Sequence, residues 1–338
     1  MKQNTCAVIS GIGSYVPSKR VSNDDLAKLV DTSDEWIYSH TGIKNRHIAD
    51  EKEATSDLAV KAAERALEKA GCPVSEVDMI LVATATPDYL GFPSTACIVQ
   101  DRIGAENAAA MDIVAACTGF IYGLETARVF IETGTYRNVL VIGAEVLSKI
   151  TDWKDRNTCV LFGDGAGAAL VSAQAAETSM KESLKRGILS SYLASYGKDA
   201  EVLLRPAGGT RVPFIPGTTP PEDLCLRMNG RKVYTFAVSV LGKTIETLLA
   251  KTGLSLQDIK YIVPHQANVR IIEACAKRLD IPLDKFFLNI KEFANTSSAS
   301  IPIALTDMEQ RGLLHPGDLI LTVGFGGGLT YGGNLLYW

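Results

Sequence analysis

The chain has 338 residues, a formal net charge of −4, and hydrophobic and charged fractions of 46% and 21%. This composition excludes extended disorder, and the length suffices for one large domain or two ordinary ones. A slightly acidic chain without a long run of lysine or arginine is poorly suited to nucleic acid or to an anionic membrane, so we expect neither as a partner.

The cysteines argue against a metal centre and against disulfides. There are seven, they are scattered, and none forms a Cys-x-x-Cys pair. We therefore expect no metal site and no disulfide framework, and a reducing, cytoplasmic location. The apolar stretch at the N-terminus is too short and too rich in glycine for a signal peptide, and we expect no membrane-spanning segment.

Short β-branched runs alternate along the chain with helical patterns, which is typical of α/β layers. Helices are predicted after Ser22 and from Ser56 to Gly71, because each begins at a capping residue with acids in its first turn. The runs that read as buried strands are 7–13, 78–84, 108–114, 138–144 and 159–165.

The second half of the sequence resembles the first. Residues 66–86 align with 248–268 at an offset of 182, and 138–143 align with 319–324 at an offset of 181. One interpretation is that any two strand–helix units look alike. The interpretation that we favour is a duplicated α/β unit whose two halves pack on each other.

The repeat divides the chain into an N-terminal half, residues 1–174, and a C-terminal half, residues 175–338. The second half opens with an insertion, 175–228, that holds five prolines between 206 and 221 and has no strong periodicity. We expect this insertion to be irregular.

Cys117 lies where an apolar run, 111–114, gives way to a helical pattern, so it is predicted at or just before a helix N-terminus. Such a position lowers the pKa of a thiol, and a strand-to-helix turn lifts the side chain out of the sheet. The alternative is a small buried hydrophobe, which is what most free cysteines are. We hold that alternative for the other six cysteines and treat Cys117 as a candidate nucleophile.

Two further polar residues follow the ends of elements in the second half. His265 comes just past a buried run, 261–263, and Asn295 begins the segment NTSSAS. A satisfied structural histidine and a helix cap are the alternative interpretations. At an offset of 181, Asn295 falls opposite the loop of Cys117. His265 falls opposite the end of the strand at 78–84, so the three polar groups can converge on one pocket.

Two glycine-rich runs, 163–168 and 323–334, read as tight turns. Neither matches the phosphate loop, and neither has the strand before and the helix after that a dinucleotide fingerprint requires. We therefore expect no permanently bound cofactor.

The segments DIVAACTGF, PHQAN and NTSSAS, in this order, resemble the thiolase-like condensing enzymes, and most closely the β-ketoacyl-[acyl carrier protein] synthase III family. The similarity continues through FPSTAC, FGDGAGAAL and FGGG. It implies a duplicated βαβαβαββ unit in five α-β-α-β-α layers. It also implies an acyltransferase that condenses a short acyl-CoA with malonyl-[acyl carrier protein] through an acyl-cysteine, releasing CoA and CO₂, at the start of type II fatty-acid synthesis.

Carried over residue by residue, the resemblance makes Cys117 the nucleophile and has His265 and Asn295 donate to the thioester carbonyl of the malonyl group. The backbone N–H groups of Cys117 and Gly327 would form the oxyanion hole. The further contacts that it implies are Thr32, Trp36, Arg156 and Asn268 for coenzyme A, Gln266, Arg270 and Lys277 for the acyl carrier protein, and Phe92 for the acyl pocket of a partner subunit in a homodimer.

The chain departs from the family pattern at two positions. His40 stands where many relatives have arginine near the adenine, and Thr235 stands where a lysine is common on the carrier face. The first change implies weaker contact with the nucleotide phosphates, and neither change touches the chemistry.

Alternatives to this function remain open. A starter, ester-forming or quinolone-forming condensing enzyme of secondary metabolism can keep the same three residues. A Cys–His–Asn hydrolase uses the same residue types but discharges its acyl-cysteine to water. A hydroxymethylglutaryl-CoA synthase would need a general-acid glutamate in the segment 85–100, which has none. The length and branching of the primer are not determined by these residues.

Overall fold

The computed structural model of the protein describes residues 5–175 and 186–338. The strands of the first half are β1 (Thr5–Tyr15), β4 (Met79–Ala83), β5 (Ala109–Ile113), β6 (Asn138–Glu145) and β7 (Gly165–Ala175). They form one five-stranded sheet in the order β1-β7-β6-β4-β5. In this sheet β4 is parallel to β5 and β6, whereas β7 is antiparallel to β6 and β1.

The second half repeats this sheet. Its strands are β8 (Gly187–Ser195), β11 (Tyr261–Pro264), β12 (Leu319–Gly326) and β13 (Thr330–Tyr337). They pair in the order β11-β12-β13-β8, with β11 parallel to β12 and the other two pairs antiparallel, as in the first half. A parallel bridge between Ile262 and Phe286 stands where the first half has β5. The predicted duplication is therefore confirmed.

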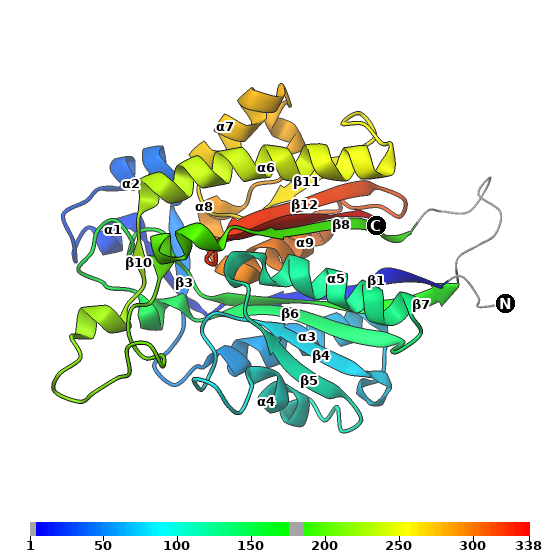
Figure 1. Ribbon diagram of the computed structural model, residues 1–338, viewed down its shortest axis with the longest axis horizontal. Coiled ribbons are helices and arrows are strands. Elements are labelled where there is room, and N and C mark those ends of the chain that lie inside the picture. The colour runs from blue at the N-terminus through cyan, green and yellow to red at the C-terminus, as the bar shows by residue number, and fades with distance from the viewer. Residues whose placement is uncertain (1–4, 176–185) are drawn as a thin grey trace.

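Helices cover and separate the two sheets, which gives five layers (Figure 1). The helices of these layers are α3 (Thr55–Ala70), α4 (Thr95–Arg102), α5 (Gly119–Glu132), α6 (Gly230–Thr252), α7 (Val269–Leu279) and α9 (Ser300–Gln310). α3 and α4 cover the outer face of the first sheet, and α6 and α7 cover that of the second. α5 and α9 lie between the sheets, where their buried apolar side chains, such as Phe120 and Leu305, form the central core.

The central layer lies close to the first sheet because glycines face it. A Cβ at Gly143 of β6 would overlap the carbonyl oxygen of Ser298, and one at Gly167 of β7 would lie 2.7 Å from Cβ of Pro302. Any side chain at these positions would push α9 and the turn before it away from the sheet. The start of α9, which follows Asn295 closely, is thereby fixed against the first half.

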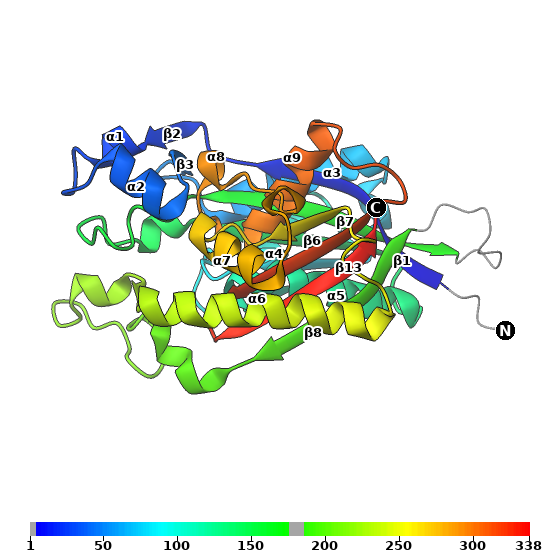
Figure 2. The ribbon, with the colours of Figure 1, turned by 90° about the horizontal axis from the view of Figure 1, so that it is seen from above.

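A smaller layer caps one end of the molecule (Figures 1 and 2). Its elements are β2 (Lys19–Ser22), α1 (Asn23–Leu26), α2 (Asp34–Thr41), β3 (Asn45–Ile48) and α8 (Ile290–Phe293). The fully buried Arg46 donates to Asn23 Oδ1 at 2.8 Å and to the carbonyl of Val160 at 2.9 Å. These partners are uncharged, and burial lowers the pKa of Arg46 to about 10. Arg46 therefore ties β3 to the turn around Val160.

The predicted strand at 159–165 was wrong. Cys159 and Val160 lie in a turn, and β7 begins only at Gly165. Both side chains are buried because they pack into the hydrophobic cluster of the capping layer. Burial explains why the run is apolar, but it does not distinguish a strand from a buried turn. The glycine-rich run at 163–168, predicted as a turn, lies largely within β7.

Two further predictions need correction. Ser56 does not cap α3, which begins at Thr55; the hydroxyl of Ser56 instead donates to Asp88 at 2.6 Å. β5 forms where 108–114 predicted a strand, but it is an edge strand rather than a buried one, and the side chain of Met111 on it is 38% exposed.

The insertion at 175–228 is only partly irregular. It contains β8 and a short antiparallel pair, β9 (Leu203–Leu204) and β10 (Arg227–Met228), and its residues 176–185 lie outside the described part of the chain. After it comes α6, which among residues 5–175 and 186–338 is the one helix long and apolar enough to cross a membrane. One face of α6 packs on β12 and β13.

Candidate active site

Cys117 sits in a 3-10 turn, Ala116–Thr118, that joins β5 to α5. Ala116 has a φ of 44°, in the left-handed region, so the chain turns sharply between strand and helix. Gly326 of β12 lies against this turn, since a Cβ at Gly326 would be 2.8 Å from both N and Cβ of Cys117. The predicted place of Cys117 between a strand and a helix N-terminus is confirmed, and the second half of the chain packs over it.

The turn after Asn295 is the counterpart in the second half. It spans Ser297–Ala299 and leads into α9, and Ser297 has a φ of 49° at the position 181 residues after Ala116. The hydroxyl of Ser298 donates to the carbonyl of Ala83, at the end of β4, at 2.8 Å. The duplicated geometry therefore brings the two strand-end loops together, as the repeat predicted.

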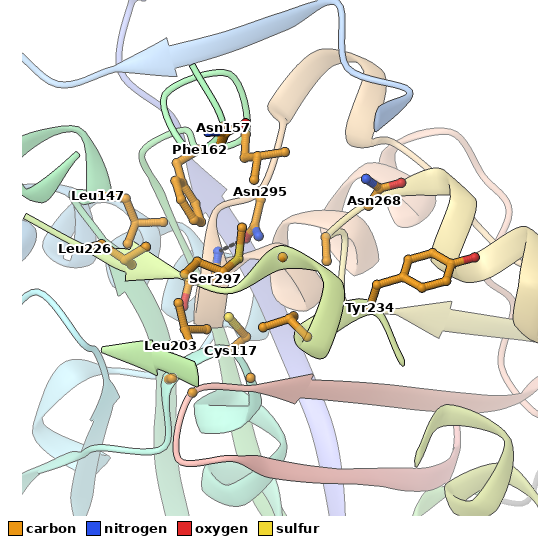
Figure 3. Close-up of a pocket in the computed structure, with 18 of the residues that line it drawn as sticks. Cys117, Leu147, Asn157, Phe162, Leu203, Leu226, Tyr234, Asn268, Asn295 and Ser297 are labelled. Carbon is orange, nitrogen blue, oxygen red and sulfur yellow. Dashed lines mark hydrogen bonds between the residues drawn. The ribbon is translucent and has the colours of Figure 1, made fainter. Parts of the chain in front are cut away.

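Asn295 is held by both halves. Its N–H donates to the carbonyl of Leu161, and its carbonyl accepts from the N–H of Gly163, both at 3.0 Å. Its Oδ1 accepts the N–H of Ser297 at 2.9 Å (Figure 3). Because this oxygen is occupied, the Nδ2 group of Asn295 is left to donate to a bound molecule.

His265 follows β11 directly and is 1% exposed. Its Nδ1 lies 2.7 Å from the hydroxyl oxygen of Ser300, and that oxygen accepts the N–H of Gln266 at 3.4 Å. In the tautomer whose hydrogen is on Nε2, the hydroxyl of Ser300 donates to Nδ1. That tautomer offers a donor to the cavity, and Phe325 holds the ring in an edge contact with centroids 5.5 Å apart.

The three predicted residues Cys117, His265 and Asn295 line one cavity of about 900 Å³. This volume suits an acyl chain with a long thioester arm. Apolar side chains line the same cavity as Cys117, among them Leu147, Phe162, Leu203 and Leu226 (Figure 3). Phe325 lines it as well.

The surroundings of the site keep both of its titratable groups neutral. The pKa of the Cys117 thiol is raised to about 12, chiefly by burial and also by the nearby Glu145, although the Ser297 hydroxyl lowers it. Burial lowers the pKa of His265 to about 3. The expected lowering of the thiol pKa was wrong, because loss of water around the sulfur outweighs the helix N-terminus. At neutral pH the resting site holds a thiol and an uncharged imidazole.

Glu145, at the end of β6, is a fully buried acid that the sequence analysis did not single out. Its oxygens accept the hydroxyls of Thr86 at 2.7 Å and of Ser297 at 3.0 Å, and the hydroxyl oxygen of Ser298, which donates to Ala83, lies 3.0 Å from Oε1. The N–H of Ala85 donates to both oxygens. Burial raises the pKa of Glu145, while these hydrogen bonds lower it. The signal in the sequence was a lone acid directly after the apolar strand NVLVIGA.

Aromatic and polar side chains gather at the mouth of the cavity. The guanidinium of Arg156 lies 4.8 Å from the centroid of the Trp36 ring, and the His40 ring stacks on Trp36 at 4.6 Å. Asn268 caps α7 and donates to the carbonyl of His40 at 3.0 Å. The hydroxyl oxygen of Thr32 is buried and has no partner among the described residues. The mouth therefore combines a stacking surface and a cation.

Of the residues expected to contact a carrier protein, one is placed differently. Gln266 is 2% exposed; its Nε2 donates to two backbone carbonyls, and its Oε1 accepts the N–H groups of Asn289 and Ile290. Its amide is fully used inside the chain, so we no longer assign it a surface contact. Arg270 lies at the cavity mouth and donates to the carbonyl of Ser39 at 3.0 Å. Lys277 is exposed in the last turn of α7.

Of two further predicted residues, Gly327 and Phe92, only the first lines the cavity. Gly327 lines the cavity next to Ala116. Phe92 does not line the cavity of its own chain, and it is 88% exposed. Within the ranges 5–175 and 186–338, no cluster of three or more histidine, cysteine, aspartate or glutamate residues could hold a metal ion.

Comparison with known proteins identifies the family. Residues 111–197 match the description 3-oxoacyl-[acyl-carrier-protein (ACP)] synthase III, and residues 249–338 match its C-terminal counterpart. The beta-ketoacyl-[acyl-carrier-protein] synthase III of Caldanaerobacter subterraneus is 52% identical over 338 residues, which cover 100% of this chain and 99% of that protein.

Similar solved structures identify the same family. The 3-oxoacyl-[acyl-carrier-protein] synthase III from Aquifex aeolicus is 44% identical, with a TM-score of 0.87 over 98% of this chain and 100% of that one. The priming beta-ketosynthase from the R1128 polyketide biosynthetic pathway is 32% identical, with a TM-score of 0.90 over 100% and 98% of the two chains. The duplicated fold, the full-length similarity and the matched segments together show that the chain belongs to the β-ketoacyl-[acyl carrier protein] synthase III family.

Proposed function

We propose that the protein performs the initiating condensation of type II fatty-acid synthesis, joining a short acyl-CoA to malonyl-[acyl carrier protein]. The observation that carries this proposal is that a thiol and two neutral donors line a single apolar cavity. The thiol belongs to Cys117 of the first half, and the donors belong to His265 and Asn295 of the second.

In the first half-reaction the sulfur of Cys117 attacks the thioester carbonyl of the acyl-CoA. The backbone N–H groups of Cys117 and Gly327 stabilise the oxyanion, the bond to the sulfur of CoA breaks, and an acyl-cysteine remains. The apolar wall around Leu147 and Leu203 holds the acyl chain and keeps water away from the intermediate.

In the second half-reaction the malonyl group loses CO₂. The enolate that forms needs donors on its oxygen, which Nε2 of His265 and Nδ2 of Asn295 supply. A neutral imidazole is suited to this role, and the pKa of His265, lowered by burial, keeps it neutral. The enolate carbon then attacks the acyl group on Cys117, and the cysteine sulfur leaves.

The residues at the mouth of the cavity suit both coenzyme A and the acyl carrier protein. Trp36 and Arg156 would stack on either side of the adenine of CoA once Arg156 moves off the ring, and the unpaired hydroxyl of Thr32 would bond its edge. Asn268 would contact the pantetheine arm. Arg270 and Lys277 supply positive charge for an acidic carrier protein.

We further propose a homodimer, since Phe92 is exposed and can enter the acyl pocket of a partner subunit. All seven cysteines are free, which suits a reducing cytoplasm. The boundary at 174/175 falls before the last residue of β7, Ala175, and separates the two halves that we propose as its domains.

The test is intact mass after mixing the protein with acetyl-CoA, propionyl-CoA and longer acyl-CoAs in competition, with a Cys117→Ala control. We expect an adduct on Cys117 that is stable in buffer and is discharged by malonyl-[acyl carrier protein] with release of CO₂. Rapid discharge by water would instead identify a hydrolase.

A starter synthase of secondary metabolism is the second candidate, and the similarity to the R1128 priming ketosynthase favours it. The higher identity to a synthase III over the full chain favours fatty-acid synthesis. Discharge of the adduct by a polyketide carrier protein in preference to that of fatty-acid synthesis would reverse this order.

A further inference from the structure

The duplication pairs two strand ends that carry very different residues. At the offset of 181, Glu145, the last residue of β6, is the counterpart of Gly326, the last residue of β12. Each of them contacts the turn of the other half: Gly326 lies against the turn of Cys117, and Glu145 bonds to the turn that follows Asn295. The proposed reaction uses both turns, but it gives Glu145 no part.

Glu145 reaches the second half through Ser297. The Ser297 hydroxyl and Oε1 of Glu145 are 3.0 Å apart, and both residues are buried. This contact does not depend on charge, because a hydroxyl can donate to a carboxylate or accept from a carboxylic acid. Ser297 has a φ of 49°, in the left-handed region, which a serine keeps only where its surroundings fix it. Glu145 supplies such a fixing contact.

Ser297 in turn orients the carboxamide of Asn295. The N–H of Ser297 donates to Oδ1 of Asn295 at 2.9 Å (Figure 3). The main chain of Asn295 is fixed separately, by its hydrogen bonds to Leu161 and Gly163. The direction of the Asn295 side chain therefore depends on where the N–H of Ser297 points. With Oδ1 held there, Nδ2 is the end of the carboxamide that remains for the cavity.

The first half holds Glu145 firmly. The N–H of Ala85 lies 3.2 Å and 3.1 Å from its two oxygens, and the hydroxyl of Thr86 donates to Oε2 at 2.7 Å. The Thr86 hydroxyl accepts the N–H of Val146 at 2.9 Å, which leaves its own hydrogen for Glu145. A side chain locked by packing and by several hydrogen bonds is a rigid support for a functional group.

We propose that Glu145 is a positioning residue for the second half-reaction: it holds Ser297 in the left-handed conformation, and Ser297 turns the carboxamide of Asn295 so that Nδ2 meets the enolate oxygen. This inference rests on the proposed function. Glu145 does not line the cavity, so it acts only through the turn, and no proton moves. The discharge of the acyl-enzyme should therefore depend on Glu145 far more than its formation does.

The test variant is Glu145→Gln, which keeps the size of the side chain. Because the N–H of Ala85 donates to both oxygens of Glu145, the NH₂ of the glutamine would face that N–H whichever way it turned. Acyl-enzyme is formed from acetyl-CoA and quantified by intact mass; malonyl-[acyl carrier protein] with a labelled carboxyl group is then added, and CO₂ is followed over a single turnover. We expect CO₂ release to slow roughly tenfold, the effect of one lost hydrogen bond, and acylation to change little.

A double-mutant cycle with Asn295→Ala separates positioning from a general structural effect. Asn295→Ala removes the donor itself and should slow CO₂ release roughly 100-fold or more. In that background Glu145→Gln should add less than about a twofold loss, because no carboxamide is left to orient. The same loss from Glu145→Gln in both backgrounds would overturn the proposal, and so would an equal loss in acylation and in CO₂ release.

Asp78→Asn is the matched control. Its carboxylate accepts the N–H groups of Arg137 and Asn138, at 2.7 Å and 2.9 Å, where β6 begins, whereas Glu145 ends the same strand. The substitution also turns a carboxylate into an amide of equal size, but far from the turn of Ser297. It should leave both half-reactions at the wild-type rate.

A crystal structure of Glu145→Gln gives a readout that does not require the reaction. We expect Ser297 to leave the left-handed region and the carboxamide of Asn295 to move with it; an unchanged turn and carboxamide would overturn the proposal. A wild type that forms no adduct on Cys117 would instead refute the proposed function, and this structure would still decide whether Glu145 sets the turn. If Glu145→Gln does not fold, Ser297→Ala, which removes the hydroxyl and keeps the N–H, replaces it in the cycle and in the structure.

Discussion

Replacing Gly326 by alanine measures how closely the second half must approach the nucleophile. The new Cβ would lie 2.8 Å from N and Cβ of Cys117 and 3.2 Å from its Cα. Carbon contacts are ordinarily about 3.5–4.0 Å, so the Cys117 turn must retreat by about 1 Å. A misplacement of that size costs roughly 100-fold in rate, and overpacking costs about 1–3 kcal/mol of stability.

The assay is the rate of acyl transfer from acetyl-CoA to Cys117, by rapid quench and intact mass, beside urea denaturation. Gly242→Ala is the matched control. Its Cβ would lie 3.5 Å from Cδ2 of Leu279, an ordinary contact, within the helix α6. The control should keep the acylation rate and gain about 0.5–1 kcal/mol of stability. A folded Gly326→Ala protein that acylates at the wild-type rate would refute the reasoning.

Three further outcomes are expected. Ser300→Ala removes the hydroxyl that lies 2.7 Å from Nδ1 of His265 and that would favour the tautomer with its hydrogen on Nε2 by donating to Nδ1. Decarboxylation of the malonyl carrier should then slow roughly tenfold, the effect of one lost hydrogen bond, while acylation changes little; equal loss in both steps would contradict this. Trp36→Ala should raise KM for acyl-CoA about 5–30-fold without lowering kcat, and should leave KM unchanged for a short acyl thioester that lacks the nucleotide; an equal rise for both thioesters would place the effect elsewhere. The pKa of His265 is about 3 in the folded chain, against an ordinary value of 6.5. The stability that the neutral His265 contributes is therefore complete above pH 6.5 and is lost as the pH falls toward 3. The urea midpoint of His265→Asn should fall less steeply across that window than the midpoint of the wild type; parallel curves would show that His265 is not the titrating group.

The repeat was the strongest signal in the sequence. Offsets of 181 and 182 predicted equivalent strand-end loops, and the structure has Ala116 and Ser297, 181 residues apart, in the same left-handed conformation. The meeting of Cys117, His265 and Asn295 at one cavity follows from that duplication. It was predictable because strand ends on one side of packed parallel units converge.

The predictions that were wrong have a common physical cause: the sequence does not show which side chains other parts of the chain cover and so remove from water. The run at 159–165 is apolar because the capping layer buries it, not because it is a strand. The thiol of Cys117 is at a helix N-terminus, yet its pKa rises because the second half covers it. Gln266 and Glu145 are polar residues whose partners come from distant segments, so their burial could not be read from neighbours in the chain.

The contact between Gly326 and Cys117 has a consequence for the order in which a working enzyme is made. Synthesis begins at the N-terminus, so the nucleophile emerges from the ribosome long before the donors His265 and Asn295, and β12, which closes over it, comes almost last. The nascent first half thus carries a thiol in an open strand-end turn, without the enolate donors and without the wall that Gly326 completes. The proposed oxyanion hole also needs Gly327, in the turn between the last two strands, so a chain that stops short of them lacks a donor that both half-reactions require.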